Sequence, residues 1–202
     1  ALGFALAGEW PSSKSATRAP ARFVVTAAPA LPLNASSQVS DLAISPDGRL
    51  VAYVAGPARG LYVRPADFLS GTLLPGTGQA GSPAFSPDGK WIAFAAAGLL
   101  KKVPSGGGPV VPLAEVPASR GICWGLNDTI VVSTFVNLAA IPGDGGVVTT
   151  FTELDSTNTK SPVRWFPEVL PGGGIVYTGR ATDGALHLAV LDRRTGQERV
   201  LP

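Results

Sequence analysis

The chain has 202 residues, of which 45% are hydrophobic and 15% are charged, so it is long and apolar enough to bury a core. Its formal net charge is +2, which is too small to indicate binding to nucleic acid or to an anionic membrane surface. It contains 25 glycines, 19 prolines and one cysteine, a composition that indicates many turns and excludes an internal disulfide.

The first ten residues are mostly apolar and end at Trp10. They are too few to span a bilayer, which needs about 20 residues, so they predict either the outer end of a transmembrane helix or the end of a signal peptide. An ordinary apolar strand or helix is the remaining alternative. Either of the first two places the rest of the chain at the periplasmic or extracellular face, and the helix would tether it to the membrane. Residues 11–21 predict a flexible linker, and residues 22–27 a single strand.

A strand–turn–strand unit then occurs twice, at residues 42–53 and again 41 residues later at residues 83–94. Each copy places a Ser-Pro-Asp-Gly turn between two apolar strands. Proline presets φ in such a turn, aspartate can accept a hydrogen bond from the backbone two residues on, and glycine adopts a positive φ without strain. The residues predicted to have this structural turn role are Ser45, Asp47, Gly48, Ser86, Asp88 and Gly89.

Two degenerate copies follow, at residues 123–132 and 169–177, and each unit continues with a third strand, a glycine-rich turn and a short fourth strand. Four antiparallel strands in about 40 residues is the pattern of one propeller blade. The sequence therefore predicts an all-β fold with a propeller domain at residues 22–202. Its four blade units are expected at about residues 39–79, 80–117, 118–155 and 161–202.

The four units have no vacant place for the strand at residues 22–27. In closed propellers a terminal strand commonly completes a blade from the other end of the chain, and propellers have about 4 to 8 blades. The units are therefore expected to be an incomplete part of a six- or seven-bladed propeller, with open end blades that would self-associate.

Catalytic and metal-binding motifs are missing from the sequence. The only histidine, His187, stands alone in an expected strand, whereas a Ser-His-acid site needs a base beside the serine. Cys123 precedes a tryptophan in an apolar strand, which predicts a small core residue and not a nucleophile. Asp47 and Asp88 are each followed by glycine, which favours turns over calcium ligation. We therefore predict a non-catalytic chain without a cofactor or a metal, and without a nucleic-acid partner.

The succession of segments resembles a known family. The segments are LAISPDGRLVAYVA at residues 42–55, LYVRPAD at 61–67, LKKVPSGGG at 100–108 and LPGGGIVYT at 170–178. They are similar to the extracytoplasmic TolB-type propeller of bacterial transmembrane serine/threonine protein kinases, over about residues 22–202. In that family a cytoplasmic kinase domain precedes a membrane helix, a proline-rich linker and the propeller.

The resemblance implies a binding or sensor module, because this chain itself carries no kinase motif. The chain departs from the family pattern at residues 126–128, where a Pro-Asp-Gly turn is usual, and at Phe166. Two other classes remain open: a TolB-like periplasmic scaffold that binds proteins, and the propeller of a prolyl-oligopeptidase-like hydrolase.

A protein or small-molecule ligand, whose identity the sequence does not indicate, is expected at the mouth of the central channel. Arg120 precedes the first strand of the third unit, and Arg164 and Trp165 occupy the same place in the fourth. We predict these three as ligand-binding residues, able to hold an acidic or aromatic group by charge-assisted hydrogen bonds and stacking. The alternative is that the arginines lie in solvated loops and that Trp165 packs between blades.

Overall fold

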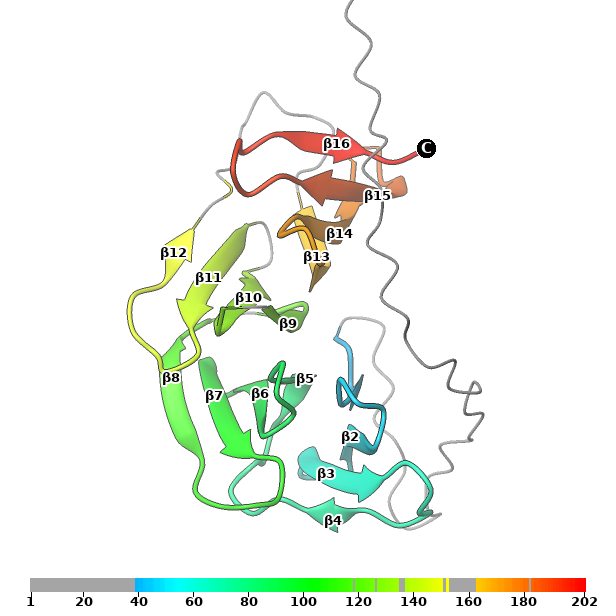
Figure 1. The fold of residues 1–202 in the computed structure, drawn as a ribbon, viewed down its shortest axis with the longest axis vertical. Coiled ribbons are helices and arrows are strands. Elements are labelled where there is room, and N and C mark those ends of the chain that lie inside the picture. The colour runs from blue at the N-terminus through cyan, green and yellow to red at the C-terminus, as the bar shows by residue number, and fades with distance from the viewer. Residues whose placement is uncertain are drawn as a thin grey trace, which may run out of the picture.

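The computed structural model describes residues 39–117, 119–125, 127–134, 137–150, 152, 163–181 and 183–202. These residues form sixteen β-strands and no helix (Figure 1). The segments predicted at residues 1–10, 11–21 and 22–27 lie outside the described residues. In the part of the chain that the structure describes, no helix is long and apolar enough to cross a membrane.

The strands form four separate sheets, and in each sheet four antiparallel strands follow one another in sequence order. We call these sheets blades 1 to 4. Blade 1 consists of β1 (Leu42–Ile44), β2 (Leu50–Ala55), β3 (Gly60–Pro65) and β4 (Thr72–Leu73). Blade 2 consists of β5 (Gly81–Phe85), β6 (Trp91–Ala96), β7 (Leu99–Pro104) and β8 (Val111–Glu115).

Blade 3 consists of β9 (Ile122–Gly125), β10 (Thr129–Ser133), β11 (Leu138–Pro142) and β12 (Thr149–Thr150). Blade 4 consists of β13 (Val163–Val169), β14 (Ile175–Arg180), β15 (Leu186–Leu191) and β16 (Glu198–Val200). The prediction of an all-β fold built from four-stranded propeller blades is confirmed. The size of a complete ring and the self-association of open blades stay predictions.

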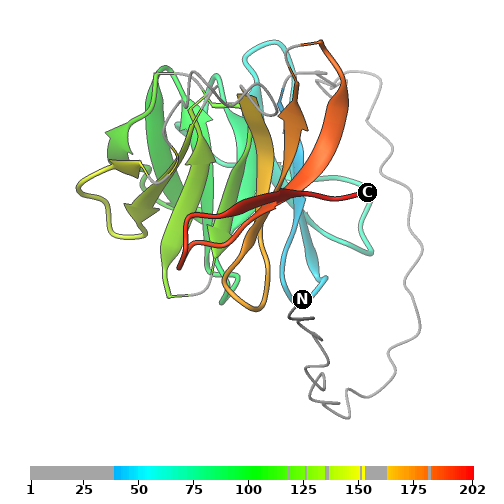
Figure 2. The ribbon, with the colours of Figure 1, turned by 90° about the horizontal axis from the view of Figure 1, so that it is seen from above.

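The blades stand in an arc with the first strand of each blade on the inside (Figure 1). Along this inner side β1 contacts β5, β5 contacts β9, and β9 contacts β13. The strands of successive blades run alongside one another when the arc is turned by 90° (Figure 2). The arc therefore brings four segments, each about 40 residues apart in sequence, to one concave wall.

One apolar cluster joins each pair of neighbouring blades, because successive residues of a strand point to opposite faces of its sheet. On β6, Ile92 and Phe94 pack into the cluster shared with blade 1, whereas Ala93 packs into the cluster shared with blade 3. Tyr177 on β14 and Val131 on β10 belong to the cluster between blades 3 and 4. The second strands of the blades thus pack apolar side chains on both faces, which explains why their sequences are nearly continuously apolar.

The Ser-Pro-Asp-Gly segment of blade 1 forms a tight turn between β1 and β2. Ser45 Oγ donates a hydrogen bond to Asp47 Oδ1 (2.6 Å) and accepts one from the backbone N–H of Leu50 (2.8 Å). The N–H of Arg49 also donates to Asp47 Oδ1, at 3.0 Å. Gly48 has a φ of 72°, a conformation that glycine adopts without strain. The hydrogen bond from Ser45 is the main reason that the pKa of the Asp47 carboxyl lies below its ordinary value.

Candidate functional site

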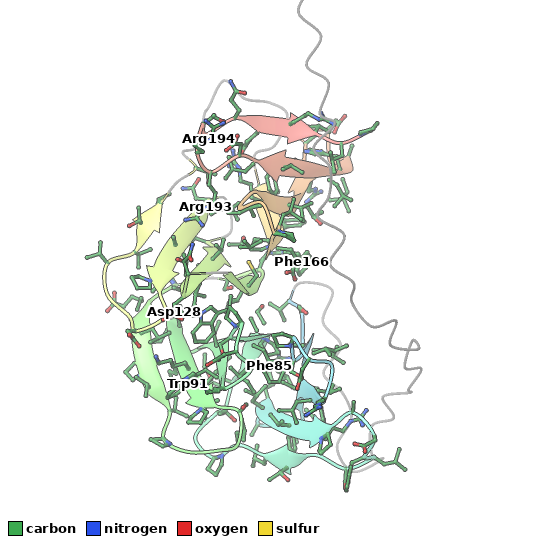
Figure 3. All side chains as sticks on the ribbon, viewed as in Figure 1. Phe85, Trp91, Asp128, Phe166, Arg193 and Arg194 are labelled. Atoms are coloured by element: carbon green, nitrogen blue, oxygen red, sulfur yellow. The ribbon has the colours of Figure 1, made fainter. Side chains whose placement is uncertain are left out.

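The innermost strands of all four blades line one hollow of about 670 Å³. Its wall contains residues of β1, β5, β9 and β13, which the arc brings together from segments far apart in the sequence. Phe85 from β5 and Phe166 from β13 lie on the inner side of the arc (Figure 3). Ligand sites in proteins are usually concave, largely apolar and of comparable volume, about 300–1,000 Å³. The hollow is therefore the candidate site.

Exposed apolar side chains from blade 1 form one side of this hollow. Leu42 is 39% exposed and Ile44 is 47% exposed, and both line the hollow. Ala43, between them on β1, packs into the cluster shared with blade 2. Alternation along the strand thus turns the two larger side chains away from blade 2 and toward the hollow. Apolar surface exposed in a concave wall is typical of a binding surface.

A β-bulge fixes Phe166 on the opposite side of the hollow. The register between β13 and β14 shifts between Trp165 and Glu168, and Phe166 has a φ of 52°, which is rare for a bulky residue. Its N–H donates to the carbonyl of Arg120 at 3.0 Å. A Cβ atom on Gly121 would lie 2.7 Å from Phe166 Cα, so the close approach of β9 and β13 requires glycine there. Unusual backbone held in this way is often found at functional sites.

Among the described residues that line the hollow, Glu168 is the only one with an acidic or basic side chain. Partial desolvation by the surrounding wall raises the pKa of its carboxyl. The other titratable group is the thiol of Cys123, whose pKa is raised to about 12, chiefly by burial and then by the charge of Glu168. Cys123 is 5% exposed, so the prediction of a small core residue is confirmed, and its thiol stays protonated at neutral pH.

The structure brings two of the three predicted ligand residues together. The guanidinium carbon of Arg120 lies 4.7 Å from the centroid of the Trp165 ring, which is a cation–π contact. The pair adjoins the hollow, because the next residue of each segment, Gly121 or Phe166, lines it. A ligand-binding role for Arg120 and Trp165 stays a prediction.

The third predicted ligand residue, Arg164, is buried within blade 4. Its Nε and Nη2 atoms donate to Glu198 Oε1 and Oε2 at 2.7 Å and 3.1 Å, a bidentate ion pair between β13 and β16. The guanidinium also lies 6.0 Å from the centroid of the Tyr177 ring, and the carbonyl of Arg164 accepts a hydrogen bond from Ser133 Oγ of blade 3. This geometry favours a structural role, and a ligand-binding role for Arg164 stays a prediction.

A smaller pocket of about 320 Å³ lies between blades 2 and 3, and the predicted turn residues Ser86 and Asp88 line it together with Trp91 and Asp128 (Figure 3). At its base, Lys102 Nζ donates to the Gly143 carbonyl (2.7 Å) and to Asp144 Oδ1 (3.0 Å). The same nitrogen lies 4.7 Å from the centroid of the Trp91 ring. Because its hydrogen-bonding capacity is largely satisfied, Lys102 serves to link blade 2 to blade 3.

Within the described ranges, the structure brings neither the predicted lone histidine nor a metal-binding cluster to the hollow. His187 lies on β15 and is not part of the lining. Among the residues that the structure describes, no group of three histidine, cysteine, aspartate or glutamate side chains is placed to hold a metal ion.

Sequence reasoning missed the residues that give the hollow its character: Leu42, Ile44, Phe85, Phe166 and Glu168. One signal was available, because each belongs to the first strand of its unit and the first strand of a propeller blade is the innermost. Phe166 was identified only as a departure from the family pattern. Its role depends on the bulge, which alternation of apolar residues does not predict.

No protein-family model matches this chain, and no curated protein matches it in sequence. Among solved structures, it is similar to a putative TolB from Agrobacterium tumefaciens, with a TM-score of 0.68 and 18% identity over 79% of this chain and 63% of that one. It is similar to TolB from Acinetobacter baumannii, with a TM-score of 0.68 and 17% identity over 81% of this chain and 43% of that one.

A chain of the nidogen/laminin complex is also similar, with a TM-score of 0.66 and 13% identity over 79% of this chain and 63% of that one. This chain therefore spans less than two thirds of the length of each of these three proteins. At such identities the likeness shows the fold alone, a β-propeller of the TolB type. The predicted likeness to TolB-type propellers is confirmed at that level, and the link to kinases stays a prediction.

Proposed function

We propose that this chain is a non-catalytic binding module that holds an extended segment of a partner protein against the hollow formed by β1, β5, β9 and β13. One observation carries the proposal: exposed apolar side chains on β1 face a fixed aromatic residue, Phe166, across a concave wall of binding-site size. Extended peptides suit such a wall, because their alternate side chains can enter it from one face.

We further propose that the module works on the extracytoplasmic side of a bacterial membrane, as the sensor part of a transmembrane serine/threonine protein kinase. The order of segments at residues 22–202 supports this proposal, and so do the apolar start and the linker expected at residues 1–21. The likeness to TolB agrees with a binding propeller but does not distinguish the classes. Sequencing the gene upstream tests the attachment: a kinase domain is expected there, and a hydrolase domain downstream would contradict it.

The binding role is tested by displaying random peptides against the purified chain and measuring the affinity of those selected. Ile44→Arg places a charge on the exposed wall of the hollow, where a bound apolar segment would have to desolvate it. We expect the selected peptides to bind this variant at least about tenfold more weakly. Leu186→Arg is the matched control, because Leu186 is 65% exposed on β15, outside the hollow. Peptides that bind both variants like the original chain would contradict the proposal.

A further inference from the structure

We propose that the hollow selects a basic side chain, a lysine or arginine of the bound segment, and that the carboxylate of Glu168 is the group that binds it. This inference rests on the proposed function, because it names the chemistry of the segment that the hollow holds. It goes beyond that function by assigning a charge preference to one residue.

The position of Glu168 on β13 turns its side chain away from blade 3. The next residue, Val169, packs into the cluster between blades 3 and 4, and a Cβ atom on Gly125 of β9 would lie 2.9 Å from Val169 Cγ2. Because successive residues of a strand point to opposite faces, Glu168 faces the other way. It lines the hollow together with Phe166, Leu42 and Ile44.

The carboxylate of Glu168 has no partner to balance its charge among the described residues, where neither a hydrogen bond nor an ion pair engages it. Glu168 is exposed at the surface of the hollow, and the wall beside it removes part of the hydration of its carboxylate, which raises its pKa. A cation in the hollow would replace the lost hydration by a charge-assisted hydrogen bond. A neutral group would leave the charge of the carboxylate unbalanced, and an acidic group would be repelled.

Basic side chains of neighbouring segments are engaged elsewhere. The guanidinium of Arg120 lies over Trp165, and that of Arg164 is bound to Glu198. The part of the wall that the structure describes thus presents one carboxylate among side chains that carry no charge.

The aliphatic part of a lysine or arginine also fits this wall. These side chains pack their methylene groups against apolar surface while the charged end reaches a polar partner. Phe166 on one side and the exposed Leu42 and Ile44 on the other offer such surface next to Glu168. A short amine without an aliphatic stem would gain the charge contact alone, so the preferred occupant is a side chain of the partner protein.

Three blocked pentapeptides test the inference on the whole 202-residue chain, each with leucine on both sides of a central lysine, glutamine or glutamate. We expect the lysine peptide to bind about tenfold more tightly than the glutamine peptide, and the glutamate peptide to bind most weakly. Glu168→Gln should abolish the preference for lysine, and Glu168→Lys should reverse it in favour of glutamate. Glu115→Gln, at an exposed position of β8, is the matched control and should keep the preference.

The outcomes separate this inference from the proposed function. Equal affinities for the three peptides, or a lysine preference that survives in Glu168→Gln, would overturn the charge selection. If the displayed peptides still bind the Ile44→Arg variant more weakly, the proposed binding function stands even though the charge selection is overturned. No measurable binding of any pentapeptide would also overturn the inference, and no selected peptide in the display experiment would overturn the proposed function as well.

Discussion

Blades 1 and 2 close their first hairpin with the same side-chain network, whereas blades 3 and 4 use two different devices. In blade 2, Ser86 Oγ donates to Asp88 Oδ1 (2.7 Å) and accepts from the N–H of Trp91 (2.9 Å). The N–H of Lys90 donates to Asp88 Oδ1 at 3.1 Å, and Gly89 has a φ of 72°. These bonds reproduce those of blade 1 within about 0.1 Å, as expected for one local motif used twice.

The turn of blade 3 has no serine, and a tryptophan takes its place as donor. Asn127 and Asp128 adopt φ angles of 61° and 52°, and Asp128 Oδ1 accepts a hydrogen bond from Trp124 Nε1 at 2.9 Å. A Cβ atom on Gly143 would lie 2.1 Å from the same oxygen, so the carboxylate needs the space that glycine leaves. The turn is therefore held by a strand residue and by a neighbouring turn, not by its own sequence.

The turn of blade 4 relies on backbone alone. Gly173 has a φ of 84°, and its N–H donates to the carbonyl of Leu170 at 2.8 Å. The side-chain interaction that ties this blade together lies elsewhere, in the buried ion pair of Arg164 and Glu198 across its first and last strands. The comparison shows that a hairpin can lose its local network when contacts distant in sequence hold the blade, which is why the repeat weakens along the chain.

The largest expected effect comes from breaking the contact on which blade 4 relies. Arg164→Ala leaves the carboxylate of Glu198, whose side chain is 18% exposed, without its partner. We expect the free energy of unfolding to fall by about 3–5 kcal/mol, the usual cost of removing one member of a buried ion pair. Urea denaturation measures this change.

The control for this prediction is Arg194→Ala in the same blade. The Arg194 side chain is 86% exposed and lies 3.9 Å from Asp192 Oδ2, so its loss should change the free energy of unfolding by less than about 0.5 kcal/mol. If Arg164→Ala does not fold, Glu198→Gln, which keeps one acceptor for the guanidinium, should fold with reduced stability. Equal denaturation midpoints for the Arg164 and Arg194 variants would contradict a structural role for the buried pair.

A smaller effect is expected from straining the local turn of blade 2. Gly89→Val forces a β-branched residue to a φ of 72°, with no side chain or backbone closer than 4.0 Å to the new Cβ. The expected loss of about 1–3 kcal/mol therefore reports backbone strain and not a clash. Gly172→Val is the matched control, because this turn glycine of blade 4 has open space and no positive φ. Similar thermal midpoints for the two variants would show that the turn tolerates strain.

The sequence predicts the features that depend on local contacts and misses those that depend on contacts distant in sequence. The turn at residues 86–89 was predictable because each of its bonds joins residues at most five apart. The partner of Arg164 was not predictable, since Glu198 is 34 residues away and the pairing requires β13 to β16 to be in register. Trp165 was predicted to precede the first strand of the fourth unit, whereas it lies within β13. The bulge that turns Phe166 into the hollow depends on Gly121 of another blade, which the sequence does not indicate.

The smallest expected effect concerns the pH dependence of the two matching turns. The hydrogen bond from Ser86 and then that from the N–H of Lys90 lower the pKa of Asp88 below its ordinary 3.8, as the equivalent bonds do for Asp47. A carboxyl whose pKa is lower in the folded state stabilises the fold above its unfolded pKa. That contribution is lost as the pH falls through the folded value.

Asp88→Asn removes this contribution but keeps an amide oxygen that can accept the same hydrogen bonds. The variant should therefore be slightly less stable than the original chain near neutral pH, and the two thermal midpoints should converge as the pH falls below about 4. Asp47→Asn should behave in the same way, because blade 1 has the same network. A difference between the original chain and Asp88→Asn that stayed constant down to pH about 2 would show that the network acts through the geometry of the turn and not through the charge of the carboxylate.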